Sequence, residues 1–277
     1  MRNVVLYPYD DVPASVVALA GTVAPERPGR PVVFDDPASY RIDTAYCEMR
    51  LSAADLAILM NRHILASAHT AIKEVSASFG DNAVALSGTM VKLGVPVPFT
   101  ATATLEPTAS GDLRVHVTAM KAAGIIPKGL IDAVGLQLST LAQPANTGVF
   151  HIEGDDMIVP VASMFPPPRF VGRLASVRVT PDALVAVIGR PAPLAAAPTH
   201  AESYIRYLGG SFSFAKLTMH DSDLTVVGQA DKAPLAYSPV HYYAQLEGGS
   251  TQSLPDFGLV ARVKDYRAVG AATAAAP

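Results

Sequence analysis

Charged residues are scarce in this sequence: they make up 16% of its 277 residues, whereas typical soluble domains have roughly 25%. The hydrophobic fraction is 50% and the mean hydropathy is +0.28. Few charges must therefore cover the surface, which predicts either an unusually large apolar core or an apolar surface that meets a lipid, a ligand or a partner. The net charge of −3 and the lack of a basic cluster exclude a typical nucleic-acid binder.

The sequence is equally short of cysteine and of long apolar runs. Cys47 is the only cysteine, which excludes an internal disulfide and a cysteine-rich metal site, so we expect a buried, inert thiol. The run Val12–Ala24 is shorter than the roughly 20 residues of a membrane-spanning helix and contains Pro13. Asp10 and Asp11 stand where a signal peptide has its basic segment, so we expect no secretory leader in this chain.

The usual catalytic signatures are also missing: there is no Gly-x-Ser-x-Gly elbow, His-Glu-x-x-His helix, Walker loop or Gly-x-Gly-x-x-Gly turn. His63 and His69 share a predicted helix, but their spacing places them on opposite faces and not on one metal. The acid pairs at 35–36, 155–156 and 221–223 occupy turn positions, where such residues cap turns more often than they bind calcium. We therefore expect a protein that is not an enzyme and has no metal or cofactor.

Two capping boxes, in which a hydroxyl and a carboxylate satisfy the first N–H groups of a helix, predict where helices begin. Ser52 with Asp55 opens an amphipathic helix of about five turns, and Thr199 with Glu202 opens a short one. The apolar face of the first helix consists of Leu56, Leu59, Met60, Ile64, Ala68, Ala71 and Ile72. A second helix, from Lys128 to Pro144, carries Leu130, Ile131, Val134, Leu138 and Leu141 on one face.

Segments that alternate apolar and polar residues predict strands, and Gly-Asp-Asn and Ser-Gly-Asp turns join them into an antiparallel meander. The strands of this meander cover 75–79, 83–88, 96–105 and 113–120, and further strands are expected at 149–155, 156–161, 172–180, 184–190, 211–220 and 224–230. The prediction is an α+β fold. Its parts are an N-terminal arm (1–45), an α+β domain (46–190), a linker (191–198), a C-terminal helix-plus-hairpin unit that extends the sheet (199–269) and a disordered tail (270–277).

Several phrases between Leu51 and Gly189 resemble the LmeA-like family of bacterial envelope proteins, which is related to the tubular lipid-binding (TULIP) superfamily. These phrases are LSAADLAILMNR, ALSGTM, VPVPFTATATL, GLIDAVGLQL and PPPRFVGRLASVRV. The resemblance implies a curved antiparallel sheet wrapped around a long helix, an apolar channel for acyl chains, and a location in the periplasm or cell envelope. The C-terminal phrase YIRYLGGSFSFAKLTMHDSDLTVVGQ resembles a group of uncharacterised bacterial proteins, and it implies no activity.

In such a channel the ligand would be a phospholipid or a fatty acid. The expected lining residues are Leu56, Leu59, Met60, Ile64, Val84, Leu86, Phe99, Ala101, Ala103, Leu105, Leu130, Val134 and Leu138. Alanine at several of these positions leaves volume, and an empty apolar cavity costs roughly 20 to 25 cal/mol per Å³ unless something fills it. The head group would lie at the mouth, near Arg62, Lys92 or Lys128.

Two other classes of function stay open beside a lipid carrier or sensor that meets lipid and the membrane surface. One is a structural or assembly module of the envelope, in which the sheet packs solid and the triple-proline segment Phe165–Phe170 binds another envelope protein. The other is a hydrolase or transferase, which would need a cleft where a histidine and an acid come within hydrogen-bonding distance.

Overall fold

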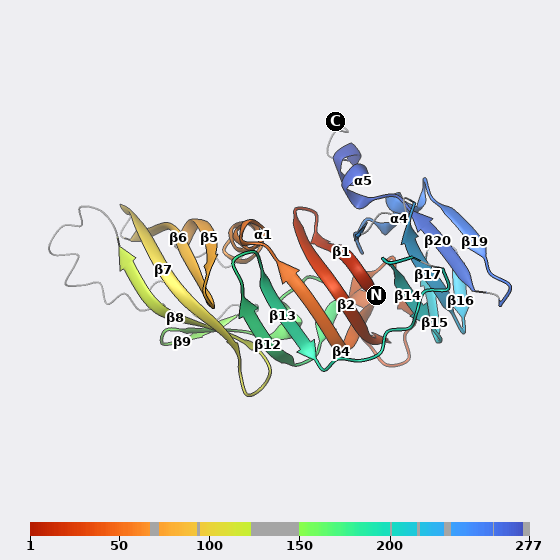
Figure 1. Cartoon of the computed structure of the whole chain (residues 1–277), viewed down its shortest axis with the longest axis horizontal. Coiled ribbons are helices and arrows are strands. Elements are labelled where there is room, and N and C mark those ends of the chain that lie inside the picture. The colour runs from red at the N-terminus through yellow and green to blue at the C-terminus, as the bar shows by residue number, and fades with distance from the viewer. Residues whose placement is uncertain are drawn as a thin grey trace. The chain divides into compact units, whose positions relative to one another are not determined.

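The computed structural model describes residues 1–66, 72–92, 95–122, 150–199, 201–214, 217–229, 234–256 and 258–273. Most of them lie in β-strands, and the chain divides into two compact units (Figure 1). Unit 1 comprises Met1–Arg50, Phe165–Gly172 and Val187–Pro277, and unit 2 comprises Leu51–Met164 and Arg173–Ala186. The predicted fold, a sheet wrapped around a long helix, is wrong: the longest helical segment in the described ranges has 12 residues.

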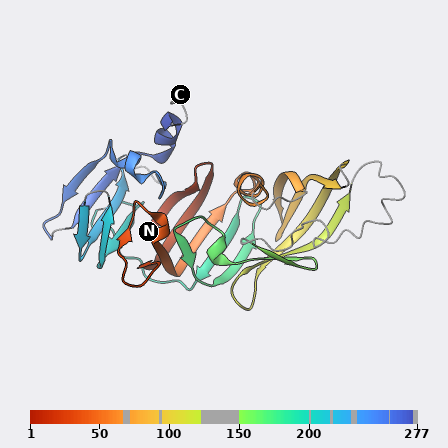
Figure 2. The same cartoon turned by 180° about the vertical axis from the view of Figure 1, so that it is seen from behind.

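Unit 2 is built on an antiparallel meander. It consists of β5 (Ile72–Gly80), β6 (Ala83–Lys92), β7 (Val95–Pro107) and β8 (Leu113–Ala122), which pair in chain order. Two short strands, β10 (Asp156–Val159) and β9 (His151–Glu153), continue the sheet beyond β8 (Figure 2). A 3₁₀ turn follows at Val161–Ser163, and β12 (Leu174–Val179) and β13 (Leu184–Gly189) form a further hairpin.

The helix of unit 2 begins where the sequence predicts but is much shorter. The Ser52 hydroxyl accepts a hydrogen bond from the N–H of Asp55, 3.1 Å away, and caps α1 (Ala53–Ile58). A π-helical segment, Leu59–Ile64, completes the helix. Ile72 then already pairs with Met90 in the sheet. Apolar residues three and four positions apart are compatible with a helix, but from Ile72 onward the chain pairs with β6 instead. The second predicted helix, from Lys128 to Pro144, lies outside the described residues.

An asparagine ties this helix directly to the sheet. The side chain of Asn61 accepts a hydrogen bond from the N–H of Val75 at 2.8 Å and donates one to its carbonyl at 2.6 Å. Val75 is buried, and Met60 packs into the same apolar cluster. Because both backbone groups of Val75 are bound by a helical side chain, β5 is held against the helix at this point.

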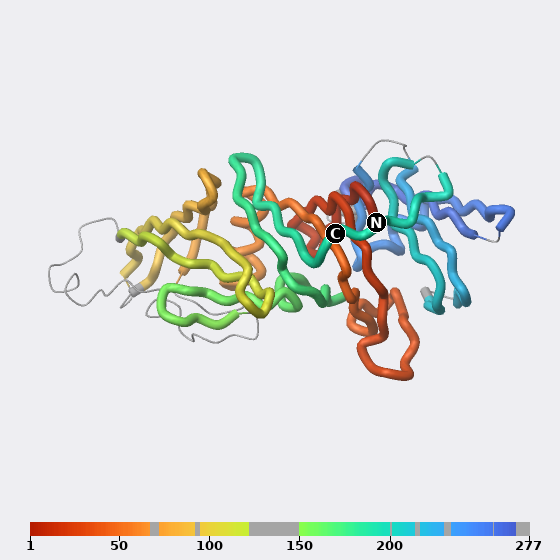
Figure 3. The backbone as a smooth tube through the Cα atoms, turned by 60° about the horizontal axis from the view of Figure 1, so that its bottom comes forward, coloured from red at the N-terminus to blue at the C-terminus, as the bar shows by residue number. Residues whose placement is uncertain are grey.

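The long strands of the first sheet of unit 1 include most of the residues that were predicted to form an N-terminal arm. In it, β1 (Arg2–Tyr9) pairs with β2 (Val12–Pro25), and β2 pairs with β4 (Tyr40–Leu51), both antiparallel. Two short strands are added in parallel: β18 (Leu235–Tyr237) beside β1, and β11 (Arg169–Val171) beside β4. The loop between β2 and β4, which carries β3 (Val32–Val33) and a 3₁₀ turn at Pro37–Ser39, projects from this sheet (Figure 3).

The triple-proline segment belongs to this sheet as well. Phe170 lies in β11 and is buried, as is Pro168 next to the strand. The rings of Phe165 and Phe170 meet edge to face with centroids 5.8 Å apart. The segment therefore contributes to the interior of unit 1.

The C-terminal part of unit 1 contains two smaller sheets. The first has the order β14 (Ile205–Leu208), β17 (Asp223–Gly228), β20 (Leu259–Val263), β19 (Ser250–Ser253). The second consists of the hairpin β15 (Ser211–Phe214) and β16 (Leu217–His220), with β3 parallel to β15. Two short helices, α4 (Tyr242–Leu246) and α5 (Tyr266–Thr273), complete the unit.

The predicted helix-plus-hairpin unit is therefore wrong in its helix. Where the capping box at Thr199 predicts a helix, the described residues 201–204 form none and lead into β14, in which Ile205 pairs with Val226. Tyr204 and Ile205 are both buried although they are neighbours. A strand buries consecutive side chains on its two faces, whereas a short surface helix would leave one of them exposed.

Two other expectations concern burial and membrane spans. Cys47 is fully buried in β4, as predicted, and burial raises the pKa of its thiol to about 12. In the ranges that the structure describes, no helix has the length and apolar character needed to cross a membrane.

Candidate functional site

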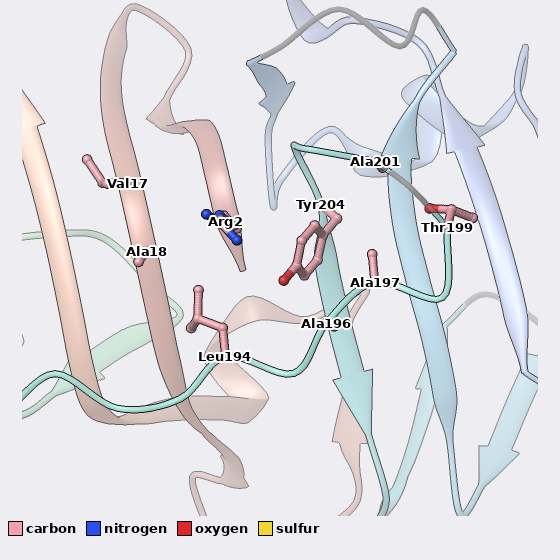
Figure 4. A pocket seen from close by; sticks show the side chains of 9 residues that line it. All are labelled: Arg2, Val17, Ala18, Leu194, Ala196, Ala197, Thr199, Ala201 and Tyr204. Atoms are coloured by element: carbon pink, nitrogen blue, oxygen red, sulfur yellow. The ribbon is translucent and has the colours of Figure 1, made fainter.

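A cleft of about 570 Å³ opens in unit 1 between the first sheet and the segment that leads into β14 (Figure 4). Three parts of the chain line it: the start of β1, the middle of β2 and the residues just before β14. The lining residues are Arg2, Val17, Ala18, Leu194, Ala196, Ala197, Thr199, Ala201 and Tyr204.

The β1–β2 hairpin supplies one wall. Arg2 and Ala18 are direct partners across the two strands, so their side chains lie on the same face of the sheet. The register between β2 and β4 shifts between Val16 and Ala18, which is a β-bulge. A bulge interrupts the alternation of side chains, and here both Val17 and Ala18 line the cleft. Val17 is 36% exposed, so this wall presents apolar surface to solvent.

Tyr204 connects this wall to the C-terminal sheet. Its N–H donates to the carbonyl of Arg2 at 3.0 Å, and the N–H of Arg2 donates to its carbonyl at 2.9 Å. The next residue pair adds a bond from the Asn3 amide to the Ser203 hydroxyl at 2.9 Å. Tyr204 is 4% exposed and packs against Val227 and Val260. Two residues about 200 positions apart in the chain, Arg2 and Tyr204, are thus fixed side by side.

The third wall is residues 190–199, here called the proline strap because it contains three prolines. It forms no strand or helix. The N–H of Arg190 donates to the carbonyl of Ala45 at 3.1 Å, which fixes its start. Further along, the Tyr204 hydroxyl donates to the carbonyl of Ala195 at 2.9 Å, and the Arg206 guanidinium donates to the carbonyl of Ala196. The strap is therefore held through its carbonyl groups.

Arg206 is itself held rigidly by an acid. Its Nε and Nη2 atoms donate to the two carboxylate oxygens of Asp223 at 3.0 and 2.7 Å, and both side chains are largely buried. This hydrogen-bonded carboxylate raises the pKa of the Arg206 guanidinium. The pair spans β14 and β17, so the anchor of the strap is as rigid as the sheet beneath it.

Two polar groups of the cleft are left without partners among the described residues. The guanidinium of Arg2 forms no hydrogen bond or ion pair there, and its side chain is exposed at the edge of the cleft. The Thr199 hydroxyl is buried and has no hydrogen-bond partner, although the sequence predicted it to cap a helix. In Figure 4, Arg2 and Thr199 lie on opposite sides of the Tyr204 ring.

The described lining residues include no acid and no histidine, so they offer a cation and an alkyl surface but no general base. Histidine pairs do occur elsewhere on the described surface. His116 lies 2.6 Å from Asp156, His241 lies 2.9 Å from Asp10, and the Ser211 hydroxyl lies 2.9 Å from the Nδ1 atom of His220. None of these residues lines the cleft.

The acid pairs of the turns have structural partners. Asp35 accepts a hydrogen bond from the Tyr242 hydroxyl at 2.5 Å, and Asp36 caps the 3₁₀ turn through the N–H of Ala38. Asp156 is bound by Arg114 and His116. In the part of the chain that the structure describes, no three metal-binding side chains come together.

The residues predicted to line a lipid channel lie elsewhere, in unit 2. Met60, Leu86, Phe99 and Ala101 pack in one cluster, and Ile64 packs in a second cluster around Phe150 and Val159. Of the others, Val84 and Ala103 are buried, and Leu56, Leu59 and Leu105 are partly buried. Leu130, Val134 and Leu138 lie outside the described residues.

Sequence reasoning missed the cleft of unit 1. The sequence signal that could have indicated it is the alanine- and proline-rich segment shortly before Tyr204. This segment, residues 191–198, was predicted to be a linker. Comparisons with protein-family models, with curated proteins and with solved structures find no match for this chain. The resemblance to the LmeA-like family stays a prediction that rests on short phrases.

Proposed function

We propose that this protein binds a lipid without modifying it, and that the cleft of unit 1 holds the ligand's alkyl chain. One observation carries this proposal: six of the nine lining residues have purely alkyl side chains. They are Val17, Ala18, Leu194, Ala196, Ala197 and Ala201. The volume of about 570 Å³ falls in the range of roughly 300 to 1,000 Å³ that small-molecule sites have.

The composition of the walls supports an alkyl ligand in particular. Alanine side chains leave room beside the strap, and each methylene that leaves water contributes about 0.8 kcal/mol. A bound chain would also cover Val17, whose exposed side chain otherwise faces solvent. Because the described lining residues include no acid–base pair, binding without chemistry fits them best.

The first test is native mass spectrometry of the protein purified without detergent, followed by organic extraction. We expect an adduct of lipid mass above the 28.9 kDa chain that disappears on extraction. A bare chain that also fails to take up an added fluorescent fatty acid would contradict the proposal.

A pair of neighbouring substitutions locates the site. Ala196 lines the cleft and Ala195 does not, although both side chains belong to the exposed part of the strap. Ala196→Trp fills part of the cleft and is expected to abolish uptake of the fatty acid, whereas Ala195→Trp is expected to keep it. The chain has no tryptophan, so each variant also carries a single fluorescent reporter. Equal uptake by both variants would place the ligand elsewhere.

A location in the bacterial envelope is part of the proposal and rests on the family resemblance alone. Fractionation of the producing cells tests it: recovery of the native protein with the periplasm or the membranes is expected.

The second candidate, an assembly module, is favoured by a different observation. Strand β19 stands at the end of its sheet, and all four of its residues are exposed. An exposed edge strand can pair with a strand of a partner protein. Recovery of a stable stoichiometric complex with no lipid bound would favour this function over the first.

A further inference from the structure

Among the described residues that line the cleft, Arg2 carries the one cationic group, and its guanidinium has no partner in the described structure. None of these lining residues is acidic, and none of the described acids forms an ion pair with Arg2. An arginine side chain offers several N–H donors in one plane, which match the oxygens of a carboxylate or phosphate. Arg2 therefore gives the cleft a group that can bind an anion.

The position of Arg2 is fixed by its backbone. The reciprocal hydrogen bonds with Tyr204, at 2.9 and 3.0 Å, and the pairing with Ala18 determine where its side chain leaves the sheet. The terminal atoms can move, but they start from the rim of an apolar cleft. A ligand whose head group is bound by Arg2 could place its alkyl tail against Leu194, Ala196 and Ala197 of the strap.

Beyond the Tyr204 ring, the described residues that line the cleft carry no charge. Thr199 and Ala201 lie across the Tyr204 ring from Arg2 (Figure 4), and they bring a methyl surface with one hydroxyl. Among the described lining residues, charge is thus confined to Arg2, and Leu194, Ala196 and Ala197 of the strap bring alkyl side chains to the same cleft. This polarity matches a molecule that has a charged head and an alkyl tail.

We propose that the cleft selects a single-chain amphiphile with an anionic head group, a carboxylate or a phosphate, which Arg2 binds while the alkyl tail lies against Leu194, Ala196 and Ala197. This inference rests on the proposed lipid binding and adds the head group to it. A fatty acid and a phosphate-bearing lipid share the chemistry that Arg2 recognises, so the experiment includes both.

The test measures binding of laurate, dodecyl phosphate and the neutral dodecyl maltoside, all below their micelle concentrations, by displacement of a fluorescent fatty acid. The three probes have the same tail, so differences report the head group. We expect the full-length protein to bind the two anions about tenfold more tightly than the neutral probe, the effect of one solvent-accessible charge-assisted contact. If only laurate binds tightly, the preferred head group is a carboxylate; if only dodecyl phosphate does, it is a phosphate.

Matched variants then assign the preference to Arg2. Arg2→Gln is expected to remove it, Arg2→Lys to keep part of it, and Arg27→Gln to leave it unchanged, because Arg27 carries the same charge on an exposed loop outside the cleft. Folding of each variant is checked by circular dichroism, and Arg2→Lys provides the test if Arg2→Gln does not fold.

Two negative outcomes are distinguishable. If the neutral probe binds as tightly as the anions, or if Arg2→Gln keeps the preference, the head-group assignment is overturned while lipid binding stands. If neither the fluorescent fatty acid nor any of the three probes binds, the proposed function itself fails.

Discussion

Gly189 and Gly209 allow a direct test of how the proline strap is fixed. Both glycines have φ = +71°, a conformation that costs an L-residue about 1 to 2 kcal/mol. At Gly209 an added Cβ would meet nothing within 4 Å. At Gly189, the last residue of β13, it would lie 1.9 Å from the carbonyl oxygen of Ala45 and 2.7 Å from its carbonyl carbon. The two positions therefore share the backbone cost and differ in the steric contact.

The magnitudes follow from these contacts. Gly209→Ala should lose about 1 to 2 kcal/mol of unfolding free energy, from the backbone cost alone. Gly189→Ala should lose about 1 to 3 kcal/mol more, since backbone must move to admit the methyl group. The same displacement would strain the bond from the Arg190 N–H to Ala45, where the strap begins. Gly189→Ala should therefore also bind the fluorescent fatty acid more weakly than Gly209→Ala.

Urea unfolding followed by circular dichroism measures the difference between the two variants. Because each substitution restricts the unfolded chain in the same way, that effect cancels in the comparison. Equal losses in the two variants would refute the close contact between Gly189 and Ala45. A normal fatty-acid affinity in a destabilised Gly189→Ala would separate the fold of the strap from its role in the cleft.

Three further predictions test other parts of unit 1. Thr199→Val removes a buried hydroxyl that has no partner among the described residues, so we expect the unfolding free energy to rise by about 1 kcal/mol in urea titrations; a loss of stability would reveal a hidden partner. Arg206→Gln leaves a largely buried carboxylate unpaired and should cost about 2 kcal/mol in the same assay, whereas Arg267→Gln, whose ion pair is exposed, should cost less than about 0.5 kcal/mol. Burial raises the pKa of Tyr207 to about 12 from its ordinary 10.0, so the stability that its neutral phenol contributes should be complete below pH 10 and be lost as the pH rises from 10 to 12 in urea titrations; an unchanged urea midpoint up to pH 12 would contradict this.

The features that the sequence predicted correctly depend on neighbouring residues. The Ser52 cap needs only the N–H of Asp55, three residues away, and it is present. The meander β5–β8 follows because each strand alternates and each turn has the residues that a tight turn requires; Asn82, for example, has φ = +55°. Such local patterns determine where elements begin and which strands pair in sequence.

The features that were mispredicted depend on partners far away in the chain. Val4 and Leu6 alternate with less buried residues in β1, but the prolines and turn-forming residues between Pro25 and Pro37 made the segment resemble an irregular arm. Tyr204 fits a helix by its spacing, yet it pairs with Arg2, and this partner is nearly 200 residues distant. Periodicity cannot reveal which of two local structures a remote strand will stabilise.

The proline strap shows why composition alone conceals a binding wall. Its three prolines have no N–H to offer a strand, and its alanines resemble those of a flexible linker. What makes the strap part of the fold is a pair of donors outside it, Tyr204 and Arg206, which bind two successive carbonyl groups. Because Arg206 does not line the cleft, its substitution would loosen the wall without touching a ligand. The proposed binding of an alkyl chain would therefore depend also on Arg206, a residue that a search among the lining side chains would not find.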